Sequence, residues 1–230
     1  MTGRPAKPPR GYQAHWARLV CAFFDRVFWN CKVIGRQHVP KGPAILAGNH
    51  AGLVDGPVVI GAAPRGVHFL MKQSLSKGIG GKILLAGGQV PVDRKNGSAA
   101  LRTCLELLDK GRLVGIFPEG TRGDGRMEKI HAGVGWLAVH SGAPVVPFAC
   151  LGTRRQGESI GKIPGFRRRL LVVFGPPVEL ALPNQEEASA KQRISLALEQ
   201  IATGLAAHVA DATKRSGMVL PTDSGRKDQP

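Results

Sequence analysis

Seven short β-rich runs, separated by helix-like segments, are the feature that most limits how this chain can fold. The runs are rich in aliphatic and β-branched residues and lie at 32–34, 44–47, 67–71, 89–92, 113–117, 145–150 and 170–174. Between two of them, residues 97–110 carry apolar side chains at helical spacing and end at Gly111, a common helix stop. This alternation predicts an α/β fold, a single domain with a central mixed sheet flanked by helices, over residues 32–212.

Further segments are assigned from the same patterns. We expect a second helix over 131–140 and a long later helix that Asn184 caps, with an apolar stripe that runs to Val209. The glycine-rich run 78–81 is predicted to be a flexible loop. Residues 213–230 are polar and lack periodicity, so they are predicted to form a disordered tail.

Residues 12–31 predict an N-terminal amphipathic helix. Its apolar stripe contains Tyr12, Trp16, Leu19, Val20, Phe23 and Val27, with Arg18 and Asp25 on the opposite side. An aromatic-rich face next to basic residues is typical of a helix that lies in the membrane interface. The same spacing is typical of a helix that packs on a core, and periodicity alone does not separate these alternatives.

The charge balance points to an anionic partner. Lys and Arg number 32 against 16 Asp and Glu, a net charge of +16, which suits nucleic acid, an acidic lipid surface or a phosphorylated small molecule. Four widely spaced cysteines indicate neither a zinc site nor a disulfide framework, and reduced thiols in a cytosol-facing protein are expected. We expect no secretory signal, no membrane-spanning segment, no metal and no cofactor.

Three common catalytic signatures are missing from the sequence. No Walker-type phosphate loop, complete dinucleotide fingerprint or Gly-x-Ser-x-Gly elbow occurs. Nucleoside triphosphate chemistry and serine esterase chemistry of the common α/β type are therefore unsupported.

Polar residues after the run 44–47 suggest a general base. His50 and Asp55 are five residues apart at the expected entry to a helix, where a turn brings the carboxylate to one imidazole nitrogen. The other nitrogen then faces substrate and takes a proton from an alcohol near neutral pH, while the carboxylate orients the ring. Taken alone, such a pair is a weak signal.

Two further strand ends supply groups that suit a phosphorylated substrate. Residues Phe117–Arg122 form a turn with one acid, one hydroxyl and one guanidinium, and Arg94 follows the run 89–92. Arginine presents a planar fork of donors that matches phosphate, so Arg94 and Arg122 next to His50 suit a phosphorylated alcohol. Solvated loop arginines and an exposed Glu119–Arg122 ion pair are the simpler structural alternatives.

Four ordered blocks make the chain resemble the glycerolipid acyltransferases, in particular the 1-acylglycerol-3-phosphate acyltransferases. The Asn-His-x4-Asp block resembles residues 49–55, the Gly-to-Arg block residues 88–94, the Phe-Pro-Glu-Gly-Thr-Arg block residues 117–122, and the proline-flanked strand residues 143–147. Gly52 departs from the pattern, because many members have Ser there, and Pro91 and Gly78 also differ. These departures bear on the shape of the acceptor pocket.

The resemblance implies transfer of a fatty acyl group from acyl-coenzyme A or acyl carrier protein to the free hydroxyl of 1-acyl-glycerol-3-phosphate, which gives phosphatidic acid. His50 would be the general base, Asp55 would orient it, and a set of residues would bind the acceptor: Arg94, Glu119, Gly120, Thr121 and Arg122. The resemblance also favours the interfacial alternative for residues 12–31 and predicts peripheral attachment to the cytoplasmic face of the cell membrane.

Two alternatives remain open at this point. One is an acyltransferase that acts on another lysophospholipid or a lipid-linked sugar. The other is a non-catalytic basic module that binds nucleic acid, although no nucleic-acid motif accompanies the charge.

Overall fold

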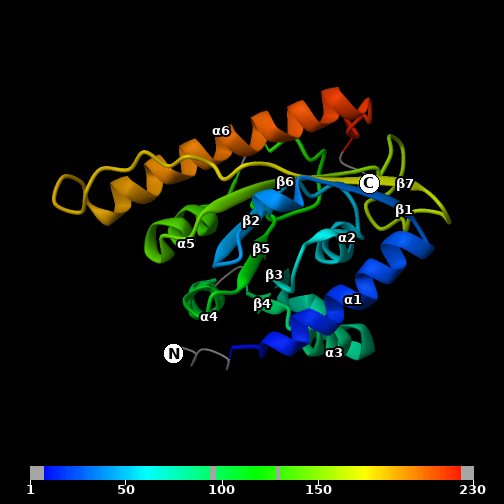
Figure 1. Cartoon of the computed structure of the whole chain (residues 1–230), viewed down its shortest axis with the longest axis horizontal. Helices are drawn as coiled ribbons and strands as arrows, with labels where there is room; N and C mark the ends of the chain where they lie inside the picture. Colours follow the sequence, from blue (N-terminus) through cyan, green and yellow to red (C-terminus); the bar gives the residue numbers. More distant parts are fainter. Residues whose placement is uncertain (1–7, 94–96, 128–129, 224–230) are drawn as a thin grey trace, which may run out of the picture.

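The seven predicted strands form one mixed sheet in the computed structural model, which describes residues 8–93, 97–127 and 130–223 (Figure 1). The strands are β1 (Asn30–Ile34), β2 (Ala44–Gly48), β3 (Val67–Lys72), β4 (Val90–Val92), β5 (Leu113–Ile116), β6 (Val145–Leu151) and β7 (Arg169–Phe174). Their order is β1-β7-β6-β2-β5-β3-β4, and every pair is parallel except β6–β7. The predicted α/β fold with a central mixed sheet is confirmed.

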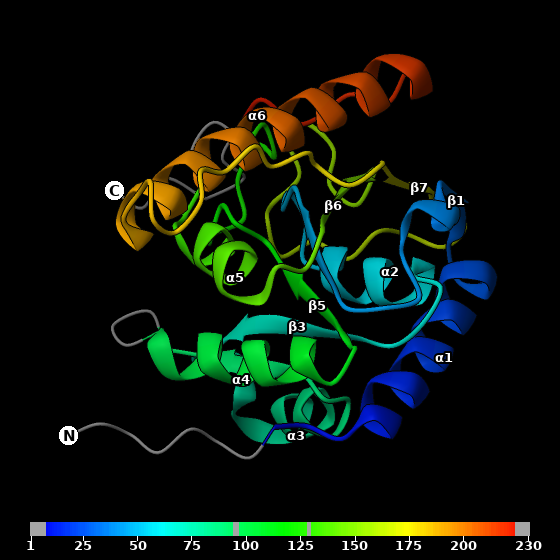
Figure 2. The ribbon, with the colours of Figure 1, turned by 60° about the vertical axis from the view of Figure 1, so that its left-hand side comes forward.

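Helices cover both faces of this sheet (Figures 1 and 2). They are α1 (Gly11–Val27), α2 (Asp55–Ala62), α3 (Gly78–Ala86), α4 (Ser98–Asp109), α5 (Gly133–Ser141) and α6 (Ala190–Ser216), with 3-10 turns η1 (Arg36–His38) and η2 (Gln73–Ser76). Because successive strand residues point to opposite faces, β2 supplies Ile45 to the core under α4, α5 and α6, and Leu46 to the core under α2.

The structure corrects two predictions about where helices begin. Residues 78–81 begin helix α3 rather than form a flexible loop. The long helix is capped by Ser189, whose hydroxyl accepts the Gln192 N–H, and not by Asn184. This capping box satisfies two orphan N–H groups at the helix start, which a lone upstream Asn does not do.

The predicted disordered tail is ordered where the structure describes it. Helix α6 continues to Ser216, and Gly217 ends it with a left-handed φ of 65°. Met218 and Leu220 then pack against the core under α6, which gives this polar segment two partly buried apolar contacts that periodicity does not reveal. The last residues of the predicted tail, 224–230, lie outside the described residues.

Helix α1 turns its aromatic stripe outwards. Tyr12 and Phe23 are 62% and 61% exposed, whereas Ala14, Ala17 and Asp25 form the buried side, which packs on α2. The core-packing alternative for the stripe is therefore wrong, and Asp25 lies on the inner side rather than the solvent side. The helix ends at Val27, before the predicted limit of residue 31, because Asn30 starts β1 against β7.

Candidate active site

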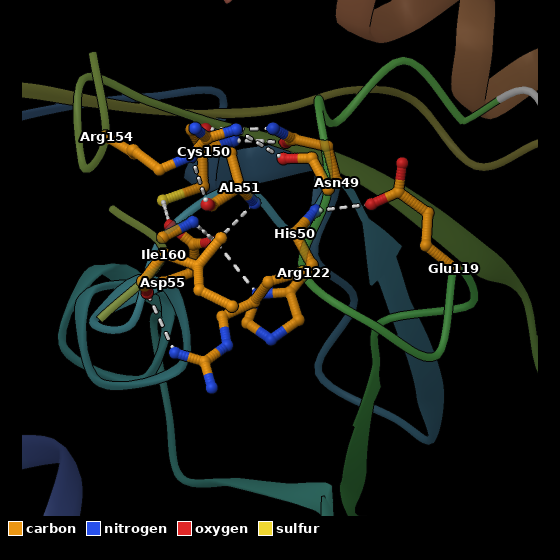
Figure 3. Close-up of polar contacts among 11 residues, drawn as sticks. Asn49, His50, Ala51, Asp55, Glu119, Arg122, Cys150, Arg154 and Ile160 are labelled. Carbon is orange, nitrogen blue, oxygen red and sulfur yellow. Dashed lines mark hydrogen bonds and ion pairs between the residues drawn. The ribbon is translucent and has the colours of Figure 1, made fainter. Parts of the chain in front are cut away.

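His50 and Asp55 meet where the central strand β2 ends. His50 Nδ1 lies 2.9 Å from Asp55 Oδ2, and the same carboxylate oxygen accepts the N–H groups of Ala51 and Gly52 at 2.8 Å (Figure 3). A carboxylate only accepts hydrogen bonds, so Nδ1 carries the proton and Nε2 keeps its lone pair. Asp55 is fully buried and His50 is partly exposed, as expected for an orienting acid behind a reactive base.

An aromatic ring also stacks on the face of the imidazole. The ring of Phe117, the residue after β5, stacks on His50 with centroids 4.1 Å apart and an interplanar angle of 18°. Strands β2 and β5 are parallel neighbours, so their carboxyl ends bring these two loops to one edge of the sheet.

Asn49 fixes the start of the same loop. Its side chain is buried, its Nδ2 donates to the Cys150 carbonyl at 3.0 Å, and its Oδ1 accepts the Cys150 N–H at 2.7 Å. Such a two-way bond to β6 replaces a strand partner at the point where β2 stops.

Glu119 joins the loop that carries His50 to the loop that follows β5 through backbone N–H groups. Its Oε2 accepts the His50 N–H at 2.9 Å and its Oε1 accepts the Met127 N–H at 3.0 Å. Burial raises the pKa of this carboxyl, and the two N–H donors oppose that shift. The described contacts of Glu119 therefore organise the loop that carries His50.

The other residues predicted to bind the acceptor lie next to Glu119, except for Arg94. Gly120 has a φ of 68°, and a Cβ there would lie 2.5 Å from the His131 ring, so only glycine fits. Thr121 is exposed. Arg122 Nη1 donates to the Ile160 carbonyl at 2.8 Å, and the next residue, Gly123, donates its N–H to the His50 carbonyl at 2.9 Å. Arg94, the other predicted phosphate ligand, lies outside the described residues.

Arg154 is a site residue that the sequence reading missed. It is buried, its Nε donates to the Ala51 carbonyl at 2.9 Å, and its Nη2 donates to the Gly123 carbonyl at 2.9 Å (Figure 3). It also binds Asp223 in the C-terminal segment. The signal that marked His50, a polar residue just after a buried strand, also applies to Arg154 after β6.

The departure at Gly52 has a steric cause. A Cβ at this position would lie 2.8 Å from Thr153 Oγ1, on the loop that follows β6. Serine in place of Gly52 would therefore require Thr153 to move.

Comparisons with known proteins agree with this geometry. The Acyltransferase family model matches residues 30–151. A 1-acyl-sn-glycerol-3-phosphate acyltransferase of Bacillus subtilis is 32% identical over 168 residues, which cover 69% of this chain and 81% of that protein. A chloroplastic 1-acyl-sn-glycerol-3-phosphate acyltransferase of Arabidopsis thaliana is 31% identical over 60% of this chain and 40% of its own length.

A solved structure shares the fold. The crystal structure of the 1-acyl-sn-glycerophosphate acyltransferase of Thermotoga maritima superposes with a TM-score of 0.59 at 23% identity, over 85% of this chain and 79% of that one. From the family match and the similarity to the Bacillus enzyme, the chain belongs to the 1-acyl-sn-glycerol-3-phosphate acyltransferase family and is an acyltransferase.

Proposed function

We propose that the protein moves a fatty acyl group from an acyl thioester, acyl-coenzyme A or acyl carrier protein, to the free hydroxyl of 1-acyl-glycerol-3-phosphate. The observation that carries this proposal is the 2.9 Å contact between His50 Nδ1 and Asp55 Oδ2, in a site that also contains the arginine-bearing turn. No metal or cofactor enters the proposal.

The reaction needs one proton transfer in each direction. His50 Nε2 takes the proton of the acceptor hydroxyl as its oxygen attacks the thioester carbonyl carbon. The C–S bond then breaks, the new ester forms, and the imidazolium returns the proton to the leaving thiolate. Asp55 keeps the ring in the reactive tautomer and stabilises its charged form.

Arg122 supports a phosphate-bearing acceptor. Its bond to Ile160 uses one donor of a guanidinium that has several, so donors remain for a phosphate. We assign acceptor binding to Arg94, Gly120, Thr121 and Arg122, with Glu119 as the residue that holds the turn. The bidentate geometry of arginine suits a phosphomonoester better than a neutral glycerol headgroup.

An acceptor panel tests this function. Purified protein with acyl-coenzyme A or acyl carrier protein is expected to release thiol with lysophosphatidic acid and to lose most of that rate with monoacylglycerol, which lacks the phosphate. Thiol release and the lipid product are both measured. A preference for a lysophospholipid with a larger headgroup, or for a lipid-linked sugar, would move the acceptor assignment and keep the chemistry.

We also propose monotopic attachment to the cytoplasmic face of the cell membrane, through the exposed stripe of α1. Among the described residues, no helix is long and apolar enough to cross a bilayer. Except for the partly buried Trp16, the aromatic and aliphatic side chains of the stripe are about half exposed or more, and Arg26 lies on the same helix. Apolar burial together with cations near anionic lipid is how interfacial helices bind. We assign the cytoplasmic side because the four cysteines are free, as is usual for a protein in a reducing compartment.

Phe23→Glu tests the attachment. Phe23 is 61% exposed, so the change should leave the fold intact and lower binding to phosphatidylglycerol vesicles about tenfold or more, because apolar burial is lost and a charge of the wrong sign is added. Co-sedimentation measures the binding, and Leu196→Glu on α6 is the matched control. Equal binding of Phe23→Glu and wild type would contradict attachment through α1.

A further inference from the structure

The loop between β6 and β7, residues 152–168, has an exposed apolar tip. Ile163 is 58% exposed and Phe166 is 69% exposed, so this loop presents two large apolar side chains to its surroundings. Three exposed cations are close to them in the sequence: Lys162, Arg167 and Arg169. Exposed apolar groups next to positive charge fit the surface of an anionic bilayer.

This tip continues the exposed surface of α1. Phe23, Phe24 and Phe28 contact one another edge to face at 5.9 and 6.5 Å, and Phe28 contacts Phe166 at 5.6 Å. All four rings are exposed by more than a third. They form a continuous aromatic strip that starts on the proposed membrane helix and ends on the β6–β7 loop.

Backbone contacts fix the loop to the end of α1. Trp29 Nε1 donates to the Pro164 carbonyl at 3.0 Å, and the Arg167 N–H donates to the Phe28 carbonyl at 2.7 Å. Arg167 takes a φ of 57°, a left-handed conformation that residues other than glycine rarely adopt. The tip is therefore held in one arrangement against the helix.

The other side of the loop reaches the active site. Arg168 and Glu158 close the loop with a bidentate pair at 2.7 and 2.5 Å, and the Arg168 guanidinium lowers the pKa of Glu158 to about 2. Between these two residues, the Ile160 carbonyl accepts the Arg122 guanidinium (Figure 3). A chain of fixed contacts thus runs from the aromatic strip to the arginine that we assign to the acceptor phosphate.

We propose that the β6–β7 loop is a second lipid-contact element, which inserts Ile163 and Phe166 at an anionic bilayer surface and thereby sets Arg122 at the depth of the lysolipid phosphate. The proposal rests on the proposed function for the role of Arg122, and the lipid contact stands without it. A lipid acceptor keeps its acyl chain in the bilayer, so an enzyme that anchors through two connected elements next to its site meets the headgroup in a fixed orientation.

Phe166→Glu tests the lipid contact in the full chain. The control is Leu196→Glu on α6, a helix that covers the other face of the sheet from α1 (Figure 1). Co-sedimentation with equimolar phosphatidylglycerol and phosphatidylcholine vesicles should show about tenfold weaker binding for Phe166→Glu and no change for the control. Acyl transfer to short-chain lysophosphatidic acid, below its micelle concentration, should stay within about twofold of wild type for both.

Several outcomes would overturn the contact. If Phe166→Glu binds vesicles as tightly as wild type does, the β6–β7 loop does not contact lipid. A lipid-independent change in oligomeric state, with vesicle binding kept, makes the strip an interface between copies of the chain instead. If Phe166→Glu lowers the rate of acyl transfer equally for monodisperse and vesicle-bound acceptor, Phe166 stabilises the fold and does not contact lipid. If wild type transfers no acyl group to lysophosphatidic acid but Phe166→Glu still loses vesicle binding, the proposed function fails and the lipid contact holds.

Glu158→Gln tests the link to Arg122. Opening the bidentate pair should raise KM for short-chain lysophosphatidic acid several-fold with little change in kcat, because the acceptor phosphate loses a positioned guanidinium. KM for monoacylglycerol should not change. Glu158→Asp, which keeps a carboxylate, should raise KM for lysophosphatidic acid less than Glu158→Gln does. A fall in kcat with unchanged KM, or an equal rise in KM for the acceptor without a phosphate, would refute the link.

Discussion

His50→Ala is expected to lower kcat/KM for acyl transfer by about 10²–10⁴-fold, the usual contribution of a positioned general base. The variant keeps the fold because the His50 backbone, and not its ring, binds Glu119 and Gly123. Initial rates of thiol release measure the loss, and thermal unfolding confirms that the variant is folded. His140→Ala removes an exposed imidazole on α5 and should leave the rate unchanged.

Added imidazole sharpens this test. The ring of His50 fills a slot between Phe117 and Asp55, so small imidazoles are expected to restore part of the activity of His50→Ala. In His50→Ala/Asp55→Asn the carboxylate that orients the ring is lost, and rescue should be much weaker. A rate for His50→Ala within a few-fold of wild type would exclude His50 as the base.

Asp25→Asn is expected to remove a large pH dependence of stability. Asp25 is 4% exposed between α1 and α2, neither carboxyl oxygen has a hydrogen-bond partner among the described residues, and a Cβ on Gly61 would lie 2.2 Å from Oδ2. Burial raises the pKa of this carboxyl to about 8, although Arg36 and Arg26 oppose the shift. Cys21 and Cys31 also face it, and burial raises the pKa of both thiols to about 12, so they stay neutral.

The sign follows from proton binding in the two states. Between about pH 4, where an unfolded Asp ionises, and about pH 8, the folded chain holds a proton that the unfolded chain has lost. The free energy of unfolding therefore falls as pH rises through this range, by on the order of 5 kcal/mol at most. Below pH 4 both states are protonated and the contribution is complete; above pH 8 it has been lost.

Urea unfolding at several pH values measures the effect. Near pH 5 the free energy of unfolding of Asp25→Asn should be close to that of wild type, apart from the cost of burying an amide in place of a carboxyl. Near pH 9 it should exceed that of wild type by several kcal/mol, because the amide does not ionise. Asp211→Asn, on the exposed side of α6, is the control and should leave the slope unchanged. Parallel pH profiles for Asp25→Asn and wild type would show that the buried carboxyl does not titrate with folding.

The site was predictable to the extent that it is local in sequence. His50 and Asp55 lie on one turn, and the strand-end rule placed them at the sheet edge with Phe117–Arg122. The contacts of Glu119 and Arg154 were not predictable, because Glu119 binds a residue 69 positions away and Arg154 binds one 103 positions away. The predicted roles of Arg94, Gly120, Thr121 and Arg122 in binding the acceptor remain predictions.

The fold shows the same division. Short β-rich runs and their spacing predicted all seven strands, since each strand's preference is local. Pattern reasoning failed for α3 and for the cap of α6, although the Ser189–Gln192 capping box is itself a local signal. It also failed for the segment after Ser216, where packing against a core distant in sequence decides the structure.

Helix α1 shows most clearly what each level decides. The sequence by itself determined that residues 12–27 are amphipathic, because the 3.6-residue period is written in adjacent turns. Only the tertiary structure decided which side is buried: small residues allow α1 to lie close on α2, so Ala14, Ala17 and Asp25 face inwards and the aromatic stripe remains outside. Periodicity fixes the relative positions of side chains around a helix, whereas the neighbour against which the helix packs fixes which of them water or lipid can reach.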